Sequence, residues 1–136
     1  MSKLRVALRQ DWTEIRDKCL AINVDHYDVP VNKLKLYDWF EQHLDRGIIF
    51  LSDTGFISGL SISDPVRDWD VLTETGWYDT GRSGLKLLRT FIEFGRITDK
   101  HDEIRMTTLS STHPKIKHLL KRMGFEEIEQ SHRLTL

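Results

Sequence analysis

Apolar and polar residues alternate with two different periods along the chain. Alternation at every second position predicts strands, and apolar residues three and four positions apart predict helices. Strands are predicted at residues 4–9, 48–51, 56–62, 69–78, 103–109 and 125–136, the last segment as one or two strands. Helices are predicted at residues 12–22, in a segment that ends at Gly47, after the glycines of residues 81–84, and at residues 112–124. The predicted order is strand, two helices, three strands, helix, strand, helix, strand.

Local signals mark the ends of these helices. Asp11 precedes the first helix and Glu14 follows three residues later, which is the spacing of a capping box. Pro114 lies in the first turn of the last helix, and Gly124 follows its last apolar residue. Gly47 ends the second helix in the same way. The chain therefore contains well-marked helices between strands and no linker.

Composition excludes several classes of protein. The 136 residues are enough for one domain with one core, so we expect a single domain over residues 1–136. The net charge of -1 lacks the basic excess of a nucleic-acid-binding protein, and no apolar run reaches the ~18 residues that span a membrane. The single cysteine, Cys19, excludes an internal disulfide, and we expect a buried thiol there. No signal peptide precedes the first strand, so we expect a cytoplasmic protein.

The segment YDTGRSGLKLLRTF, residues 78–91, joins a predicted strand to a predicted helix through two glycines. Backbone N–H groups at such a helix start can bind an anion, and the helix dipole adds to the effect. Gly81 and Gly84 would allow close approach of a phosphate, and Arg82 and Lys86 would add positive charge. The segment is neither a Walker loop nor GxGxxG, and a plain turn remains the alternative.

Four segments together resemble the GNAT superfamily, the acyl-CoA-dependent N-acyltransferases. LRVALRQDWTEI resembles the opening strand and helix, and SDTGFISG resembles the hairpin between strands 2 and 3, with Gly59 at the usual glycine. GRSGLKLL resembles the loop for the CoA pyrophosphate, and HLLKRMGFEE resembles the last helix and its K-x-G-F ending. The resemblance covers nearly the whole chain. It implies an α/β (α+β) fold with a mixed, mainly antiparallel sheet flanked by helices.

The sequence departs from the family pattern at four positions. Gly81 stands where glutamine or arginine is usual, and Lys86 where a small residue is usual. Leu120 stands where many relatives carry a tyrosine that protonates the leaving thiolate, and His113 where an asparagine is frequent. A catalytically inactive protein of the same fold is therefore an open alternative to an enzyme.

The resemblance also implies the site residues. Asp70 and Glu74 share one face of their predicted strand, and we expect one of them to be the catalytic base, with solvated acids or pairing with Arg67 as the alternative. His113 is a further catalytic candidate, although it also suits a helix start. The cofactor-binding candidates are Trp77, Tyr78, Gly81, Arg82, Ser83, Gly84, Leu85 and Lys86. The candidates for acceptor binding are His26 and Tyr27, in the loop that borders the acceptor site in the family.

Two functions follow as hypotheses. The first is a small N-acyltransferase that moves an acetyl group from acetyl-CoA to a primary amine of a small molecule or a protein. The second is an inactive interaction or assembly protein, of the kind associated with phage virions, with a virion location. A homo-oligomer is a further expectation, and no nucleic acid or membrane partner is expected. The six histidines show no metal-binding spacing, so no metal is expected.

Overall fold

The structure, a computed structural model, describes residues 3–26, 31–108 and 112–136, with residues 23–26 described by their backbone alone. It contains two compact units, residues 1–106 and residues 107–136. The elements of the first unit are β1 (Arg5–Val6), η1 (Arg9–Asp11), α1 (Trp12–His26), α2 (Lys33–Arg46), β2 (Gly47–Leu51), β3 (Gly55–Ser63), β4 (Asp70–Asp79), α3 (Gly84–Ile97) and β5 (Glu103–Arg105). The second unit contains α4 (Pro114–Arg122). No helix in these ranges is long and apolar enough to cross a membrane.

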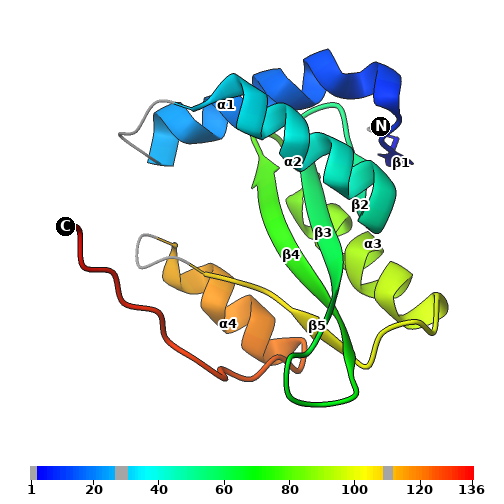
Figure 1. Ribbon diagram of the computed structural model, residues 1–136, viewed down its shortest axis with the longest axis vertical. Coiled ribbons are helices and arrows are strands. Elements are labelled where there is room, and N and C mark those ends of the chain that lie inside the picture. The colour runs from blue at the N-terminus through cyan, green and yellow to red at the C-terminus, as the bar shows by residue number, and fades with distance from the viewer. Residues whose placement is uncertain (1–2, 27–30, 109–111) are drawn as a thin grey trace. The chain divides into compact units, whose positions relative to one another are not determined.

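The five strands form one sheet in the order β1-β2-β3-β4-β5 (Figure 1). The first four strands are antiparallel to their neighbours, and β5 runs parallel to β4. The structure therefore confirms the predicted mixed, mainly antiparallel sheet. The pairing of β4 with β5 covers only three positions, Val71↔Glu103 to Thr73↔Arg105, although β4 continues to Asp79.

Alternate residues of β2 contact helices on opposite faces of this sheet. Ile49 and Leu51 are buried in one cluster with Ile15 of α1 and Phe40 of α2. Phe50 lies between them in sequence and contacts Phe94 of α3, with 5.7 Å between ring centroids. Because neighbouring strand residues point to opposite faces, α1 and α2 cover one face and α3 covers the other. The burial of the central strands is the result of these two helical layers.

Gly59 of β3 sets how closely α3 approaches the sheet. A Cβ atom at this position would lie 2.5 Å from Cε2 of Phe91, which is closer than two carbon atoms can approach. Phe91 is itself fully buried. The glycine that the sequence indicated in this hairpin is therefore required by the packing of α3.

The helix ends follow the sequence signals with one exception. The side chain of Asn32 accepts from the N–H groups of Leu34 and Lys35 at the start of α2, and Gly47 follows its last residue. α1 begins at Trp12 as predicted and continues to His26, beyond the predicted end. Asp11 was expected to cap α1, but its carboxylate instead accepts from the backbone N–H of Leu8 at 2.7 Å.

In the second unit, α4 begins and ends as the sequence indicates. The imidazole Nδ1 of His113 accepts from the backbone N–H of Lys115 at 3.1 Å, and Gly124 has a φ of 97° directly after the helix. No strand is assigned to residues 125–136, in contrast to the closing strand predicted there. Ile128 and Leu134, which such a strand would bury, are 59% and 84% exposed. Without a partner for their apolar faces, these positions have no reason to pair.

Candidate functional site

The strand β4 leads directly into α3 through a four-residue turn, Thr80 to Ser83. This is the connection that the sequence singled out as an anion site. Trp77 of β4 ties the two elements together, because its indole Nε1 donates to the carbonyl oxygen of Gly84 at 3.1 Å. The turn is also held to the β2–β3 turn, since the backbone N–H and the hydroxyl of Thr80 both donate to the carbonyl oxygen of Thr54.

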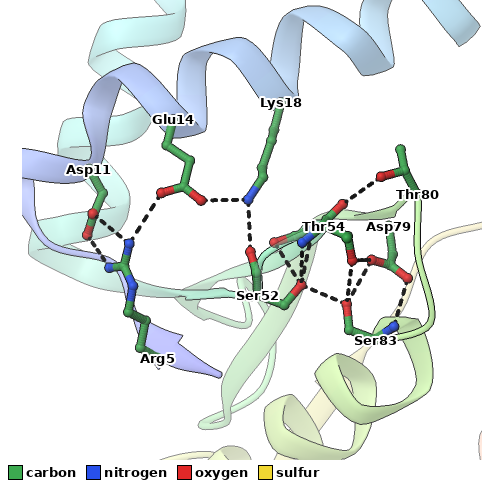
Figure 2. Close-up of polar contacts among 10 residues, drawn as sticks. Arg5, Asp11, Glu14, Lys18, Ser52, Thr54, Asp79, Thr80 and Ser83 are labelled. Atoms are coloured by element: carbon green, nitrogen blue, oxygen red, sulfur yellow. Dashed lines mark hydrogen bonds and ion pairs between the residues drawn. The ribbon is translucent and has the colours of Figure 1, made fainter. Parts of the chain in front are cut away.

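The carboxylate of Asp79 lies at the start of α3 (Figure 2). Its Oδ2 atom accepts from the backbone N–H groups of Ser83 at 2.9 Å and Gly84 at 3.0 Å. Its Oδ1 atom accepts from the hydroxyls of Ser83, at 2.7 Å, and Thr54. A helix N-terminus attracts anions, and this one already has an anion from its own chain.

Hydrogen bonding keeps Asp79 ionised. Partial burial raises the pKa of its carboxyl, but the hydrogen bonds from Thr54, from Ser83 and from the backbone of Gly81 outweigh burial and lower the pKa below its usual range. The sequence analysis did not select Asp79. The signal was available, because an aspartate a few residues before a helix is a common partner for the first N–H groups.

Two further N–H groups belong to the same helix start. Among the residues that the structure describes, nothing accepts from the backbone N–H groups of Leu85 and Lys86. The side chains of Arg82 and Lys86 are exposed beside them. An external anion would therefore meet two N–H groups and two cations, next to the negative charge of Asp79.

The two glycines of the turn have different roles. A Cβ atom on Gly81 would lie 2.6–2.9 Å from the side-chain atoms of Thr54, so this position has no room for a side chain. A Cβ atom on Gly84 would lie 3.7 Å from Asp79, which is an ordinary contact. Close packing against the β2–β3 turn thus explains Gly81, and Gly84 faces the carboxylate of Asp79.

Buried hydroxyls connect this turn to α1 (Figure 2). The hydroxyls of Ser52 and Ser83 are 2.7 Å apart, and both side chains are buried. The ammonium of Lys18 donates to the carbonyl oxygen of Ser52 at 2.9 Å and to Glu14 at 2.8 Å. Arg5 pairs with the same Glu14 and with Asp11, the residue that precedes α1. The chain from Arg5 to Asp79 therefore forms one polar network.

An open cavity of about 710 Å³ lies beside this network, between α1 and the β2–β3 turn. Its charged lining residues are Asp11, Glu14, Asp17, Asp53 and Lys18. Four carboxylates against one ammonium make the lining net negative. Such a cavity suits a cationic ligand better than a phosphate.

The two candidate bases on β4 lie at different places along the strand. Asp70 is the first residue of β4 and is exposed, and its carboxylate accepts from the hydroxyl of Ser63 at 3.2 Å. It lies nine residues, or about 30 Å along the strand, from Asp79. Glu74 is half-buried in mid-strand opposite Gly59, on the face that α3 covers. Both share this face, as predicted, because the register from Asp70 to Glu74 is regular. Arg67 pairs with neither of them and contacts Asp64 and Glu103 instead.

A β-bulge interrupts β4 immediately after Glu74. Ser58 pairs with Gly76 and Gly59 pairs with Glu74, so Thr75 is an extra residue without an opposite partner. Its hydroxyl contacts the buried His43 of α2. No sequence pattern indicated this pair, because the two residues lie 32 positions apart.

The remaining candidates are placed as follows. His113 caps α4 in the second unit. His26 is the last residue of α1, with its side chain not described, and Tyr27 lies outside the described residues. Cys19, predicted to be buried, is half-buried, and desolvation raises the pKa of its thiol to about 12. No group of three metal-ligating side chains occurs within residues 3–26, 31–108 and 112–136.

Comparison with known proteins gives a match by structure alone. No protein-family model matches the sequence, and no curated protein matches it. A possible acetyltransferase from Clostridium difficile 630 is similar with a TM-score of 0.76, at 10% identity over 100% of this chain and 98% of that one. The aminoglycoside N-acetyltransferase AAC(6')-Iy, in complex with the bisubstrate analogue CoA-S-monomethyl-acetylneamine, has a TM-score of 0.74, at 18% identity over 100% and 98%.

A transcriptional regulator from Bacillus halodurans C-125 also matches, with a TM-score of 0.74, at 14% identity over 100% of both chains. These identities are too low to transfer an activity, but the matches extend over nearly the full length of each chain. They show that the fold described above recurs in acetyltransferases over nearly the whole of this chain. The chain therefore has the fold of the GNAT superfamily of acetyltransferases.

Proposed function

We propose that this protein is an N-acetyltransferase that uses acetyl-CoA and acts on an amine. The observation that carries the proposal is the full-length similarity to AAC(6')-Iy in a complex with a CoA-containing bisubstrate analogue. That complex joins a CoA group to an amine-bearing acceptor in one molecule. The proposal places the same two ligand classes on this chain.

The start of α3 fits a phosphate group beyond Asp79. The N–H groups of Leu85 and Lys86 and the side chains of Arg82 and Lys86 would hold it, with Trp77 and Tyr78 on the preceding strand. Acetyl-CoA, when bound, supplies an acetyl group activated as a thioester. The ionised Asp79 opposes such binding, so we expect a modest affinity.

The acceptor amine needs a group that removes its proton. Glu74 is the better placed of the two strand carboxylates, because it is half-buried in mid-strand beside the bulge, whereas Asp70 is exposed at the far end of β4. The net negative cavity next to α1 favours a cationic acceptor, such as a polyamine or an aminoglycoside. His26 and Tyr27 remain proposed acceptor contacts.

Acetyl-CoA titration followed by thermal unfolding tests the proposal. Acetyl-CoA at about 100 times its dissociation constant should stabilise the folded protein by about 2.7 kcal/mol. Lys86→Ala should weaken binding by about 1–2 kcal/mol, or about 5- to 30-fold, since it removes a charged partner of the phosphate. Lys100→Ala, an exposed lysine beyond α3, is the matched control and should leave the affinity unchanged. Transfer is then measured with neamine and a panel of primary amines.

The alternative is an inactive protein of the same fold, for interaction or assembly, in a virion rather than the cytoplasm. Two observations favour it: Asp79 occupies the first N–H groups of α3, and Leu120 is a buried leucine in α4. If millimolar acetyl-CoA produced no thermal shift, the enzyme proposal would be wrong and this alternative would take its place.

A further inference from the structure

A chain of three side chains crosses the interior of the sheet face that α2 covers. His43 of α2 is 1% exposed, and its Nε2 atom lies 2.6 Å from the hydroxyl oxygen of Thr75. The same hydroxyl lies 2.9 Å from the hydroxyl of Ser58, which is fully buried on β3. On its other side, Nδ1 of His43 lies 2.7 Å from the carbonyl oxygen of Trp39.

The partners fix the direction of each hydrogen bond. A carbonyl oxygen only accepts, so Nδ1 of His43 must carry a hydrogen and donate to Trp39. In the neutral imidazole Nε2 is then bare and accepts the hydroxyl proton of Thr75. Since that proton is used, the hydroxyl of Ser58 donates to Thr75 at 2.9 Å in preference to the carbonyl oxygen of Gly76, which is 3.4 Å away. Every proton of the chain therefore points from Ser58 through Thr75 to His43.

His43 is held in its neutral form. Burial lowers the pKa of the imidazole, and the carbonyl of Trp39 raises it by a smaller amount. No charged side chain is among these influences, and Glu74, the neighbour of Thr75, lies on the other face of β4. A neutral imidazole with a bare nitrogen against a hydroxyl is the arrangement in which a hydroxyl is activated as a proton carrier. The carbonyl of Trp39 orients the base, as a third group does in such arrangements.

Thr75 is the least buried of the three side chains in this chain. It is the extra residue of the β4 bulge and is half-buried, whereas His43 and Ser58 are buried. The pairing of β4 with β5 ends two residues earlier, at Thr73. Bulges frequently occur next to active sites, where they redirect a side chain.

We propose that the hydroxyl of Thr75, rather than the carboxylate of Glu74 on the opposite face of β4, takes the proton of the acceptor amine and passes its own proton to Nε2 of His43. The inference rests on the proposed acetyl transfer. As the ammonium loses this proton, the C–N bond forms and the C–S bond of the thioester breaks. The second proton of the nitrogen goes to the departing thiolate, and the imidazolium of His43 later releases its proton to water. Thr75 is the catalytic residue of this step, and His43 is a positioning residue that acts through it.

Variants of the full chain separate this role from a structural one. Thr75→Val removes the hydroxyl at similar size and should lower kcat/KM about 100-fold or more, the scale of general base catalysis, with little change in acetyl-CoA affinity. Thr75→Ser keeps the hydroxyl and should restore most of the rate. The kcat/KM of the wild type should decline as the pH falls through the lowered pKa of His43, and His43→Gln should remove that decline. His101→Gln is the matched control, since Nε2 of His101 also contacts a serine hydroxyl, that of Ser61.

A second measurement does not depend on activity. Nitrogen-15 NMR at pH 7 should show His43 as the neutral tautomer with hydrogen on Nδ1, and Thr75→Val but not His101→Gln should shift its Nε2 resonance. A tautomer with hydrogen on Nε2 would overturn the proposal, as would a His43→Gln protein with the wild-type pH profile. An acetyl group found on Thr75 would also overturn it, because the hydroxyl would then act as a nucleophile. If the wild type neither binds acetyl-CoA nor transfers acetyl, the proposed function fails together with this inference, whereas the other outcomes leave that function intact.

Discussion

Asp79 determines what the first turn of α3 can bind. The backbone N–H groups of Ser83 and Gly84 both donate to its carboxylate, and so do two hydroxyls. An external phosphate is therefore limited to the next N–H groups and to the flanking cations. This single side chain affects both the stability of the turn and its affinity for anions, and the two effects have opposite signs.

Removal of Asp79 separates these effects. Asp79→Ala should lower the free energy of unfolding by about 2 kcal/mol, because it removes a helix cap and leaves two hydroxyls without their acceptor. The same variant should bind acetyl-CoA more tightly, since it frees two N–H groups and removes a negative charge. Urea unfolding and acetyl-CoA titration measure the two quantities.

Asp53→Ala is the matched control for this variant. Asp53 lies in the adjacent β2–β3 turn and lines the same cavity, but it accepts none of these hydrogen bonds. Its removal should change the free energy of unfolding by less than about 0.5 kcal/mol. Weaker acetyl-CoA binding by Asp79→Ala would contradict the competition between the carboxylate and the phosphate.

At the residue scale, the sequence could indicate positions but not partners. The glycines and cations of residues 81–86 were visible because a strand, a turn and a helix follow each other there. Asp79 was within the same segment, yet its role depends on Thr54, which the fold brings from 25 positions away. His43 and Thr75 were not predictable at all, because their contact exists only after α2 packs on the sheet.

At the element scale, two substitutions in the turn before α3 test the different roles of its glycines. Gly81→Ala should destabilise the protein by about 1–3 kcal/mol, because the new methyl group would overlap the side chain of Thr54, which the bond to Asp79 holds in place. Gly84→Ala should be neutral or slightly stabilising, since its methyl group meets only ordinary contacts and alanine favours a helix. Chemical denaturation measures the free energy of unfolding of both variants. Equal losses of this free energy would show that position 84 also has no room for a side chain.

Elements with strong local signals were predictable, and elements that depend on distant partners were not. α4 begins with Pro114 and ends at Arg122, two residues before Gly124, and both signals act within one turn of the chain. The hairpin of β2 and β3 was likewise readable from its turn. The closing strand at residues 125–136 was not formed, because alternation specifies a strand only where a neighbour can pair with it.

At the scale of the whole molecule, buried titratable groups predict two steps in the dependence of stability on pH. The pKa of His43 is lowered by burial, so the unfolded chain binds its proton first and stability should fall as the pH decreases below about 6.5. Asp11 and Asp79 also have lowered pKa values, so a second fall should follow below about pH 4. Urea midpoints between pH 8 and pH 3 measure both steps.

Two variants identify the groups responsible. His43→Gln should reduce the upper step and leave the lower one unchanged. His101, whose pKa is also lowered, accounts for what remains of the upper step. An upper step of unchanged size in His43→Gln would show that this histidine does not remain neutral in the folded protein.

The order of elements, together with the four segments that resemble the GNAT superfamily, was sufficient to predict the fold, although matching structures share only 9–18% of its residues. The spacing of apolar residues and the signals for turns persist at such low identity, because many residue types satisfy each of them. The chemistry of the site does not survive in the same way, since it depends on single side chains. This is why the sheet could be predicted and the proton pathway could not.

The carboxylate at the start of α3 has one more consequence, which concerns concentration. A group tethered a few residues away acts on its partner at an effective concentration on the order of millimolar or more, so a free anion displaces it only at a still higher concentration. Inorganic phosphate or sulfate in a buffer therefore competes poorly for this turn and should neither stabilise the protein nor inhibit it. Only a ligand held by additional contacts elsewhere on the chain gains an advantage comparable to that of Asp79. The turn thus favours long ligands over small anions, because the additional contacts of a long ligand raise its effective concentration at the turn.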